Sequence, residues 1–408
     1  MKTVGIIVEY NPLHYGHVYH FEQAKSASGA DAVIAVMSGH FLQRGEPALV
    51  NKWARAEMAL RMGVDVVIEL PAAFASQPAE WFAYGAVSAL DASGVTDSLC
   101  FGSESGEIGW LERLAEVMHR EPEGFGELLR QELSRGAAYP AAYSSAVSTL
   151  TGQPAEGLAQ PNNTLGLHYL IALKRLKSSI RPLTITRRKA GYHQQEVTDS
   201  RIASATAIRK LLFEEKDLRA AARLLPDYTY AILEREWAAG RAPMSWERFA
   251  GPLFHTLLSR TAADLASISE MTEGLEHRIK RVLPLLDYSR PDQVGQLLAA
   301  LKTKRYTQTK LQRTLLRILL HHSKYDLNRE ALALGVPYLR ILGFTTRGRE
   351  LLKRMKRVAR VPIISKVTEE SADFLQQDIR ATSVYSLGYP TRNARDLFRD
   401  YYEPPLRL

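Results

Sequence analysis

Short apolar runs alternate with amphipathic stretches along the first half of the chain. The apolar runs are rich in β-branched residues and predict strands over residues 3–10, 32–38, 64–70, 98–102 and 183–187. The amphipathic stretches predict helices over residues 18–26, 52–62, 80–92, 107–118, 124–135, 163–177 and 205–213. Continuously apolar strands are typical of a parallel sheet buried between helix layers, so we expect ligands at the carboxyl ends of the strands.

The second half of the chain has a different pattern. Beyond about residue 215 the strand signals fade, and residues 218–360 predict helices separated by Pro and Gly positions such as Pro226, Pro284 and Gly335. We therefore expect an α/β protein in which residues 1–215 form a Rossmann-like parallel-sheet domain. Residues 216–408 are expected to form a mainly α-helical domain.

The composition is that of an ordinary globular protein, with 46% hydrophobic and 24% charged residues among 408. No apolar stretch approaches the length of a membrane-spanning helix, and the N-terminus lacks the basic region and long apolar core of a signal peptide. The single cysteine, Cys100, excludes an intramolecular disulfide, and no Cys/His cluster has zinc spacing. We expect a cytoplasmic protein with no membrane partner.

Positive charge is concentrated in one part of the chain. The net charge is +9, but residues 301–360 alone contain 16 basic and 3 acidic residues, so the remainder is net negative. A solvated helix face would explain a short basic run. This run covers two predicted helices and is interleaved with Tyr306, Tyr325, Tyr338 and Phe344. Such a stretch is typical of a polyanion site and predicts binding to nucleic acid.

The most informative motif follows the first predicted strand. The strand ends at Tyr10, a turn follows, and the letters His-Tyr-Gly-His at residues 14–17 open a helix. His14 and His17 then lie one turn apart on one side, where free N–H groups and the positive end of the helix dipole attract an anion. Gly16 lets a phosphate approach the backbone. Two surface histidines would give the same letters, but their position favours the H-x-G-H phosphate site of nucleotidyltransferases.

Two further segments fall at predicted strand and helix ends. Gly102 ends a strand and would permit close approach of a nucleotide, although a glycine at a strand end is more often just part of a turn. Asn162 and Asn163 precede a long helical pattern. One of these residues is explained as a helix cap, but two adjacent amides also offer the paired donor and acceptor that would recognise adenine or ribose.

Cations and hydroxyls follow the fifth predicted strand. Arg187 and Arg188 lie just past its end, where a triphosphate would lie in a parallel-sheet enzyme, although a basic surface loop explains these two residues equally well when they are taken alone. Ser204, Thr206 and Arg209 open the next helix. A plain N-cap explains Ser204, whereas the whole string of hydroxyls and N–H groups would suit the β- and γ-phosphates.

Together these residues resemble the HIGH-type nucleotidyltransferase superfamily, in which an early H-x-G-H and a late S-x-T-x-x-R bracket the triphosphate. The likeness narrows to the family of bacterial tRNA(Met) cytidine acetate ligases in the segments 5–12, 36–39, 43–48, 102–104, 161–163, 190–193 and 306–307. It runs over nearly the full length, including the basic helical half. Leu13 and Tyr15, on either side of His14, differ from the Phe and Asn that the family is expected to carry there more often.

The resemblance implies ATP-dependent N4-acetylation of the wobble cytidine of elongator tRNA(Met), with free acetate as the acyl donor. Acetate would attack the α-phosphorus, pyrophosphate would leave, and the cytidine would then attack the acetyl-adenylate. The implied partners are therefore ATP, acetate and elongator tRNA(Met), and Mg²⁺ is expected to accompany the triphosphate. Two alternatives stay open. An adenylyltransferase for a small phosphorylated metabolite would leave the basic stretch without a role. A non-catalytic RNA-binding protein would leave the intact motifs unexplained.

The family pattern also implies roles for individual residues. The expected catalytic residues are His14, His17, Ser204, Thr206 and Arg209. The expected ATP contacts are Ile7, Val8, Glu9, Tyr10, Asn11, Pro12, Leu13, His14, Tyr15, Gly16, His17, Val18, Tyr19, His20, Gly102, Asn162, Arg187 and Arg188. From the basic stretch, the expected tRNA contacts are Lys353, Arg354, Lys356 and Arg357.

Overall fold

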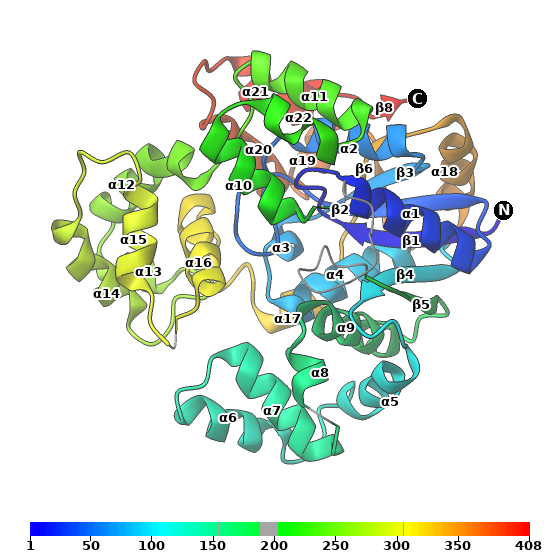
Figure 1. Ribbon diagram of the computed structural model, residues 1–408, viewed down its shortest axis with the longest axis horizontal. Coiled ribbons are helices and arrows are strands. Elements are labelled where there is room, and N and C mark those ends of the chain that lie inside the picture. The colour runs from blue at the N-terminus through cyan, green and yellow to red at the C-terminus, as the bar shows by residue number, and fades with distance from the viewer. Residues whose placement is uncertain (154, 188–202, 305) are drawn as a thin grey trace.

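The computed structural model describes residues 1–153, 155–187, 203–304 and 306–408. Its centre is a sheet of eight strands in the order β5-β4-β1-β2-β3-β6-β7, with β8 paired to β6 (Figure 1). The five strands of the first half are mutually parallel, which confirms the expected α/β class with a Rossmann-like sheet. They are β1 (Thr3–Val8), β2 (Ala32–Ser38), β3 (Val66–Leu70), β4 (Ser98–Ser103) and β5 (Arg181–Thr186).

Both faces of this sheet are covered by helices, as the continuously apolar strands predict. Along β2, Ile34 and Val36 face one core while Val33 and Met37 face the other. One layer is formed mainly by α4 (Ala79–Ala92), α5 (Gly109–Met118), α9 (Pro161–Arg175) and α18 (Thr346–Val358). The opposite layer is formed by α1 (Tyr15–Ser28), α2 (Lys52–Met62), α10 (Ala205–Glu215) and α11 (Asp227–Ala238).

Element ends follow local chemistry. Strand β1 ends at Val8, two residues before the expected end, because Tyr10 takes a left-handed φ of 51°. Helix α1 begins at Tyr15, three residues earlier than expected, because the His14 side chain caps it. Helix α2 has the expected bounds, with Asn51 as its N-cap and a left-handed Gly63 at its C-terminus. Helix α7 (Tyr139–Thr151) was not predicted.

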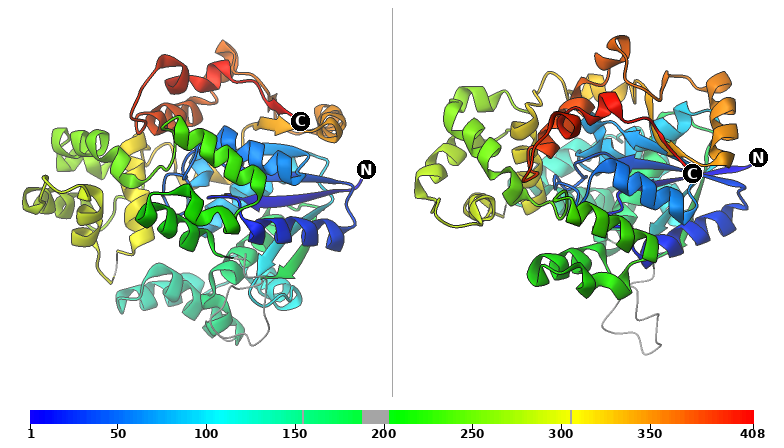
Figure 2. Two further views of the ribbon diagram at one scale, coloured as in Figure 1. Left: turned by 45° about the horizontal axis from the view of Figure 1, so that its top comes forward. Right: turned by 90° about the horizontal axis from the view of Figure 1, so that it is seen from above.

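A separate helical region lies beyond the carboxyl ends of the parallel strands, on the side of the sheet away from the N-terminus (Figures 1 and 2). Its own core joins η2 (Trp246–Phe249), α12 (Ala250–Ser259), α13 (Ala262–Ala266), α14 (Leu275–Val282), η3 (Leu283–Leu285), α15 (Gln293–Leu301), α16 (Gln308–Leu320) and α20 (Gln376–Ser386). Helix α16 packs tightly on the loop after β2, since a Cβ at Gly45 would lie 2.4 Å from the Arg313 amide nitrogen.

The last part of the chain returns to the sheet. Strand β6 (Leu339–Phe344) is antiparallel to β3, and β7 (Ile363–Ile364) and β8 (Leu406–Arg407) are parallel to β6. Packing is also continuous across the expected boundary near residue 215, since Leu212 of α10 and Leu218 of η1 (Leu218–Leu224) share one core. The division into two independently folding domains therefore stays a prediction, and the part after residue 215 contributes strands as well as helices.

The remaining helices of the described residues are mostly short. They are α3 (Ala72–Ala75), α6 (Phe125–Ser134), α8 (Ala155–Ala159), α17 (Arg329–Ala333), α19 (Glu369–Ala372), α21 (Ala394–Leu397) and α22 (Arg399–Tyr402). Among the described residues, no helix has the length and apolar character needed to cross a membrane.

Buried charges tie the C-terminal segment to the sheet. The ammonium of Lys52 on α2 lies 2.8 Å from the Glu69 carboxylate at the end of β3 and 2.9 Å from that of Asp400 on α22. All three side chains are at most 3% exposed. Because an unpaired buried charge is costly, this cluster makes the stability of the sheet depend on a contact between residues 348 positions apart.

Candidate active site

The carboxyl ends of β1, β4 and β5 gather most of the residues that the motifs singled out. Strand β1 pairs with β2 on one side and β4 on the other, so the chain leaves β1 in one direction and returns on the opposite side. Such a switch point opens a crevice at the carboxyl ends of the two strands. The H-x-G-H turn follows β1, Gly102 lies in β4, and Arg187 directly follows β5.

The two histidines are held in one tautomer by the start of α1. The His14 Nδ1 accepts the Gly16 N–H at 3.1 Å, and the His17 Nδ1 accepts the His14 N–H at 3.3 Å. The neutral rings therefore carry their proton on Nε2. Their centroids are 4.0 Å apart, and a Cβ at residue 16 would lie 2.8 Å from the His14 ring, which explains the glycine. The turn thus presents two adjacent Nε2–H donors.

Both histidines are kept neutral by their surroundings. Burial, together with the nearby charges of Arg187 and Arg209, lowers the pKa of His14 to about 4. Burial also holds the pKa of His17 well below its usual 6.5, with His14, His20 and Arg187 adding to the effect. A neutral Nε2–H donates to a phosphoryl oxygen without needing a proton from solvent, so the donors keep the same form across physiological pH.

This geometry predicts a pH dependence for nucleotide chemistry. Because the histidine pKa values are lowered, both rings stay neutral above pH 6, and the rate of ATP cleavage at the α-phosphorus should show no transition near 6.5. Acetate-dependent exchange of pyrophosphate into ATP, measured from pH 5.5 to 8.5, tests this. A rate that falls with a midpoint near 6.5 as the pH is raised would show instead that an imidazolium is required.

Arg209 connects α10 to the H-x-G-H turn. Its Nη1 donates to the Asn11 carbonyl oxygen at 2.9 Å, and its Nη2 lies 3.4 Å from the Thr206 hydroxyl and 3.5 Å from a Glu46 carboxylate oxygen. The Ser204 hydroxyl accepts the Ala207 N–H at 3.2 Å and caps α10. The structure therefore brings Arg209 and Thr206 beside the histidine turn, and it explains Ser204 as a helix cap. The expected phosphate contacts of these three residues stay predictions.

Gly102, Asn162 and Arg187 also meet. The Arg187 guanidinium donates to the Asn162 side-chain oxygen at 2.7 Å, and a Cβ at Gly102 would lie 2.8 Å from the Arg187 side chain. The Asn162 amide donates to the Glu104 carboxylate at 2.6 Å, and that carboxylate also accepts the Asn163 N–H at 2.8 Å. Glu104 thus caps α9 and fixes Asn162 beside Arg187. Arg188 lies outside the described residues.

The structure also places several other residues of the 7–20 run. The side chains of Val8, Tyr10 and Leu13 are buried in the core, so only their backbone is available to a nucleotide. The Asn11 side chain accepts the Leu49 N–H at 2.6 Å and holds the loop after β2. The Nε2 of His20 is buried without a hydrogen-bond partner among the described residues.

Sequence reasoning missed Arg55, which organises the loop after β2. Its side chain is fully buried and donates to the carbonyl oxygens of Glu9 at 2.8 Å and Ser38 at 3.0 Å, and also to that of Gly39. An arginine in a helical pattern is ordinarily assigned to the solvent face. The only signal was the small residues Ala54 and Ala56 on either side of it.

The four expected tRNA-binding cations lie elsewhere. Lys353, Arg354, Lys356 and Arg357 are exposed on α18. The Arg354 guanidinium donates to the carbonyl oxygen of Met1 at 2.8 Å, so α18 runs beside the amino end of β1 (Figure 2). The structure therefore does not bring these residues together with the histidine turn, which lies at the opposite, carboxyl end of β1.

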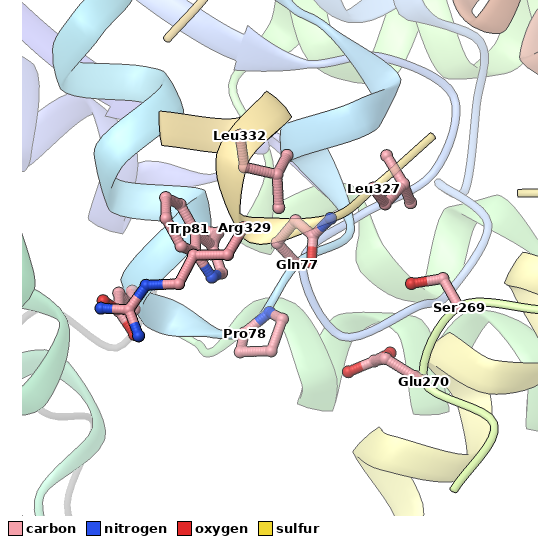
Figure 3. Close-up of a pocket in the computed structure, with 9 residues that line it drawn as sticks. Gln77, Pro78, Trp81, Ser269, Glu270, Leu327, Arg329 and Leu332 are labelled. Carbon is pink, nitrogen blue, oxygen red and sulfur yellow. The ribbon is translucent and has the colours of Figure 1, made fainter. Parts of the chain in front are cut away.

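A cavity of about 250 Å³ lies apart from this site (Figure 3). Its lining residues come from the segment that opens α4, the segment after α13 and the surroundings of α17: Gln77, Pro78, Glu80, Trp81, Ser269, Glu270, Leu327, Arg329 and Leu332. None of the expected ATP contacts that the structure describes lines it.

Known proteins resemble the chain over its whole length. The family model HIGH Nucleotidyl Transferase matches residues 1–400. Relatives called tRNA(Met) cytidine acetate ligase include one from Caldanaerobacter subterraneus subsp. tengcongensis, 40% identical with all of both chains covered, and one from Acetivibrio thermocellus, 40% identical with 95% of each covered. A crystal structure of Thermotoga maritima TmcAL bound with alpha-thio ATP matches with a TM-score of 0.89 at 35% identity, covering all of both chains. The chain therefore belongs to the HIGH nucleotidyl transferase family and, within it, to the tRNA(Met) cytidine acetate ligases.

Proposed function

We propose that this protein is an ATP-dependent, AMP-forming ligase that acetylates N4 of the wobble cytidine of elongator tRNA(Met) with free acetate. The observation that carries the proposal is the pair of neutral Nε2–H donors at the start of α1, with Arg187 and Arg209 beside them. Full-length relatives of that name, and a solved relative bound with an ATP analogue, support it. A ligase acting on tRNA is expected to work in the cytoplasm.

The first step activates acetate. An acetate oxygen attacks the α-phosphorus of ATP, pyrophosphate leaves, and acetyl-adenylate remains. Negative charge shifts over the phosphoryl oxygens in the transition state, where fixed donors in a site of low dielectric are most effective. His14 and His17, the positive end of the α1 dipole, Arg187 and Arg209 supply those donors.

The second step transfers the acetyl group. The N4 amine of cytidine attacks the carbonyl carbon of the mixed anhydride, and AMP leaves. A wobble base lies in an unpaired loop, so turning it out into a pocket costs little. Activation is needed because acetate has no good leaving group and the cytosine amine is a weak nucleophile.

Mg²⁺ is expected to enter with the triphosphate. Among the described residues, no group of three or more His, Cys, Asp or Glu side chains is arranged to hold a metal ion. Mg²⁺ commonly keeps several waters and binds through substrate phosphates with few protein ligands, so the residues present fit an ion carried by ATP. Its contribution would be to offset charge on the β- and γ-phosphates.

The proposal is tested by incubating the protein with ATP, acetate and an elongator tRNA(Met) transcript. We expect AMP and N4-acetylcytidine in equal amounts, measured by mass spectrometry of nucleotides and digested tRNA. A transcript with uridine at the wobble position lacks the amine and serves as the matched control. AMP or pyrophosphate release that requires a small phosphorylated metabolite instead of acetate would support the adenylyltransferase alternative.

The cations on α18 give a separate prediction. Reversing the charge at Lys353, Arg354, Lys356 and Arg357 should weaken tRNA binding and flatten its salt dependence, because each lost phosphate contact releases about 0.9 fewer counterions. ATP affinity should not change, because α18 lies beside the amino end of β1, whereas the histidine turn follows its carboxyl end. Filter binding over a salt series measures both effects. Reversal at the exposed Arg130 and Arg135 of α6 is the control, and unchanged tRNA affinity in the α18 variant would exclude this helix from the interface.

A further inference from the structure

Glu9 occupies a position that the activation of acetate does not explain. It follows β1 directly and lies five residues before His14, and its side chain is half-buried. One carboxylate oxygen, Oε1, accepts the Gln43 N–H at 2.7 Å and the Ser38 hydroxyl at 3.2 Å. The other oxygen, Oε2, has no hydrogen-bond or ion-pair partner among the residues that the structure describes. The carboxylate is therefore fixed by one oxygen while the other is available.

Activation and transfer need different chemical groups. Acetate at neutral pH is already a carboxylate, so the first step needs donors and no base. In the second step, N4 must lose a proton as the amide forms, so a proton acceptor is required. The site must therefore contain an acceptor in addition to the donors described above.

The described residues of the site leave few candidates for that acceptor. His14 and His17 use Nδ1 to accept backbone N–H groups and carry protons on Nε2, while Arg187 and Arg209 are cationic. The carboxylates of Glu46 and Glu104 are engaged with Arg209 and with the start of α9, respectively. Glu9 alone among these groups presents a carboxylate oxygen without a partner.

We propose that Glu9 is the general base of acetyl transfer. As N4 of the cytidine attacks the carbonyl carbon of acetyl-adenylate, the C–N bond forms and the C–O bond to AMP breaks. AMP leaves with the electron pair of that bond, and Glu9 Oε2 takes the proton from N4. The proton then passes to solvent. This role rests on the proposed function, because it assigns a residue to the second step of that reaction.

The surroundings of Glu9 suit proton transfer. Burial raises its pKa above the usual carboxyl value, and the Gln43 N–H, the Ser38 hydroxyl and the charges of Arg55 and Arg44 only partly oppose the rise. Arg209 on α10 and Tyr169 on α9 also face it. A carboxylate with a raised pKa is a stronger base, and it is ionised once the pH exceeds that pKa. The rate of acetyl transfer should therefore rise with pH as Glu9 loses its proton, and then reach a plateau.

The decisive variant is Glu9→Gln. Glutamine keeps an oxygen that can accept from Gln43 and Ser38 but replaces Oε2 with an amide nitrogen that takes no proton. Because residue 9 belongs to the run expected to contact ATP, acetate-dependent pyrophosphate exchange is measured on the same variant, and acetyl transfer should be slowed by a much larger factor than exchange. Single-turnover transfer from preformed acetyl-adenylate to tRNA should slow by about 10²- to 10⁴-fold and lose its rise with pH.

A second variant tests the role through the pH profile. Ser38→Ala removes one donor to Oε1, which raises the pKa of Glu9 and should move the acidic limb of the transfer rate to higher pH while the plateau persists. A merely structural Glu9 predicts no such shift.

The outcomes separate this inference from the function on which it rests. Equal transfer rates and pH profiles for Glu9→Gln and the unmodified protein would overturn the role of Glu9. So would an equal loss of pyrophosphate exchange and transfer, because that result places Glu9 in ATP binding or folding. If the unmodified protein forms acetyl-adenylate but acetylates no tRNA, the proposed function fails, and the inference fails with it.

Discussion

Replacing His17 with alanine is expected to slow acetyl-adenylate formation by about 10²-fold or more while ATP still binds. The Nε2–H of His17 lies beside that of His14 at the start of α1, where phosphoryl charge develops. A donor that acts mainly in the transition state lowers the rate when it is removed, with less effect on substrate affinity. Acetate-dependent pyrophosphate exchange and ATP titration measure the two quantities.

His14 allows a matched comparison, because its ring also caps α1. His14→Ala removes both the cap and the Nε2–H donor, and losing the cap costs about 1 kcal/mol of stability. Asparagine is a strong N-cap with a shorter side chain, so His14→Asn should restore thermal stability but not the rate of activation. If both His14→Asn and His17→Ala kept near-normal activation rates, the histidine pair would not be catalytic.

Lys52→Met should produce the largest loss of stability, about 3–5 kcal/mol in the free energy of unfolding, because it removes the cation nearest to the buried carboxylates of Glu69 and Asp400. Asp400 then keeps Arg340, 3.7 Å away, as a more distant cation. Urea unfolding followed by circular dichroism measures this difference. The control is Arg61→Met on the same helix. The Arg61 side chain is 47% exposed, so its ion pair with Glu57 should contribute less than about 1 kcal/mol. Similar stabilities for the two variants would show that the buried cluster contributes little.

The destabilisation by Lys52→Met should depend on pH. Burial already raises the pKa of Glu69 to about 7, outweighing the attraction of Lys52, and removing that cation raises it further. A carboxyl group whose pKa is raised by folding stabilises the fold only when protonated, so its contribution is lost as the pH rises through the folded-state value. The variant should therefore be closer in stability to the unmodified protein at pH 6 than at pH 8.

The basic stretch shows where sequence reasoning lost accuracy. Its 16 basic residues predict a strongly charged surface, but Arg317 is fully buried and Arg340 is only 2% exposed. Arg317 donates to the backbone and side chain of Ser76, and Arg340 lies in strand β6 near Asp400. Composition counts charges without showing which ones the fold encloses, so it overstated the surface available to tRNA.

The sequence by itself determined local features of the protein, namely its strands and its short motifs. Apolar runs specified the parallel strands, since side chains buried on both faces leave a continuous pattern. The H-x-G-H and S-x-T-x-x-R strings predict nucleotide chemistry, and the structure brings the two strings side by side through the contact of Arg209 with Asn11. Tertiary structure decided what depends on pairing between distant residues. The return of β6 to β3, the seating of α18 beside Met1 and the contact of Lys52 with Asp400 join segments hundreds of positions apart. No local pattern records such contacts, because their energy exists only once the chain has brought those segments together.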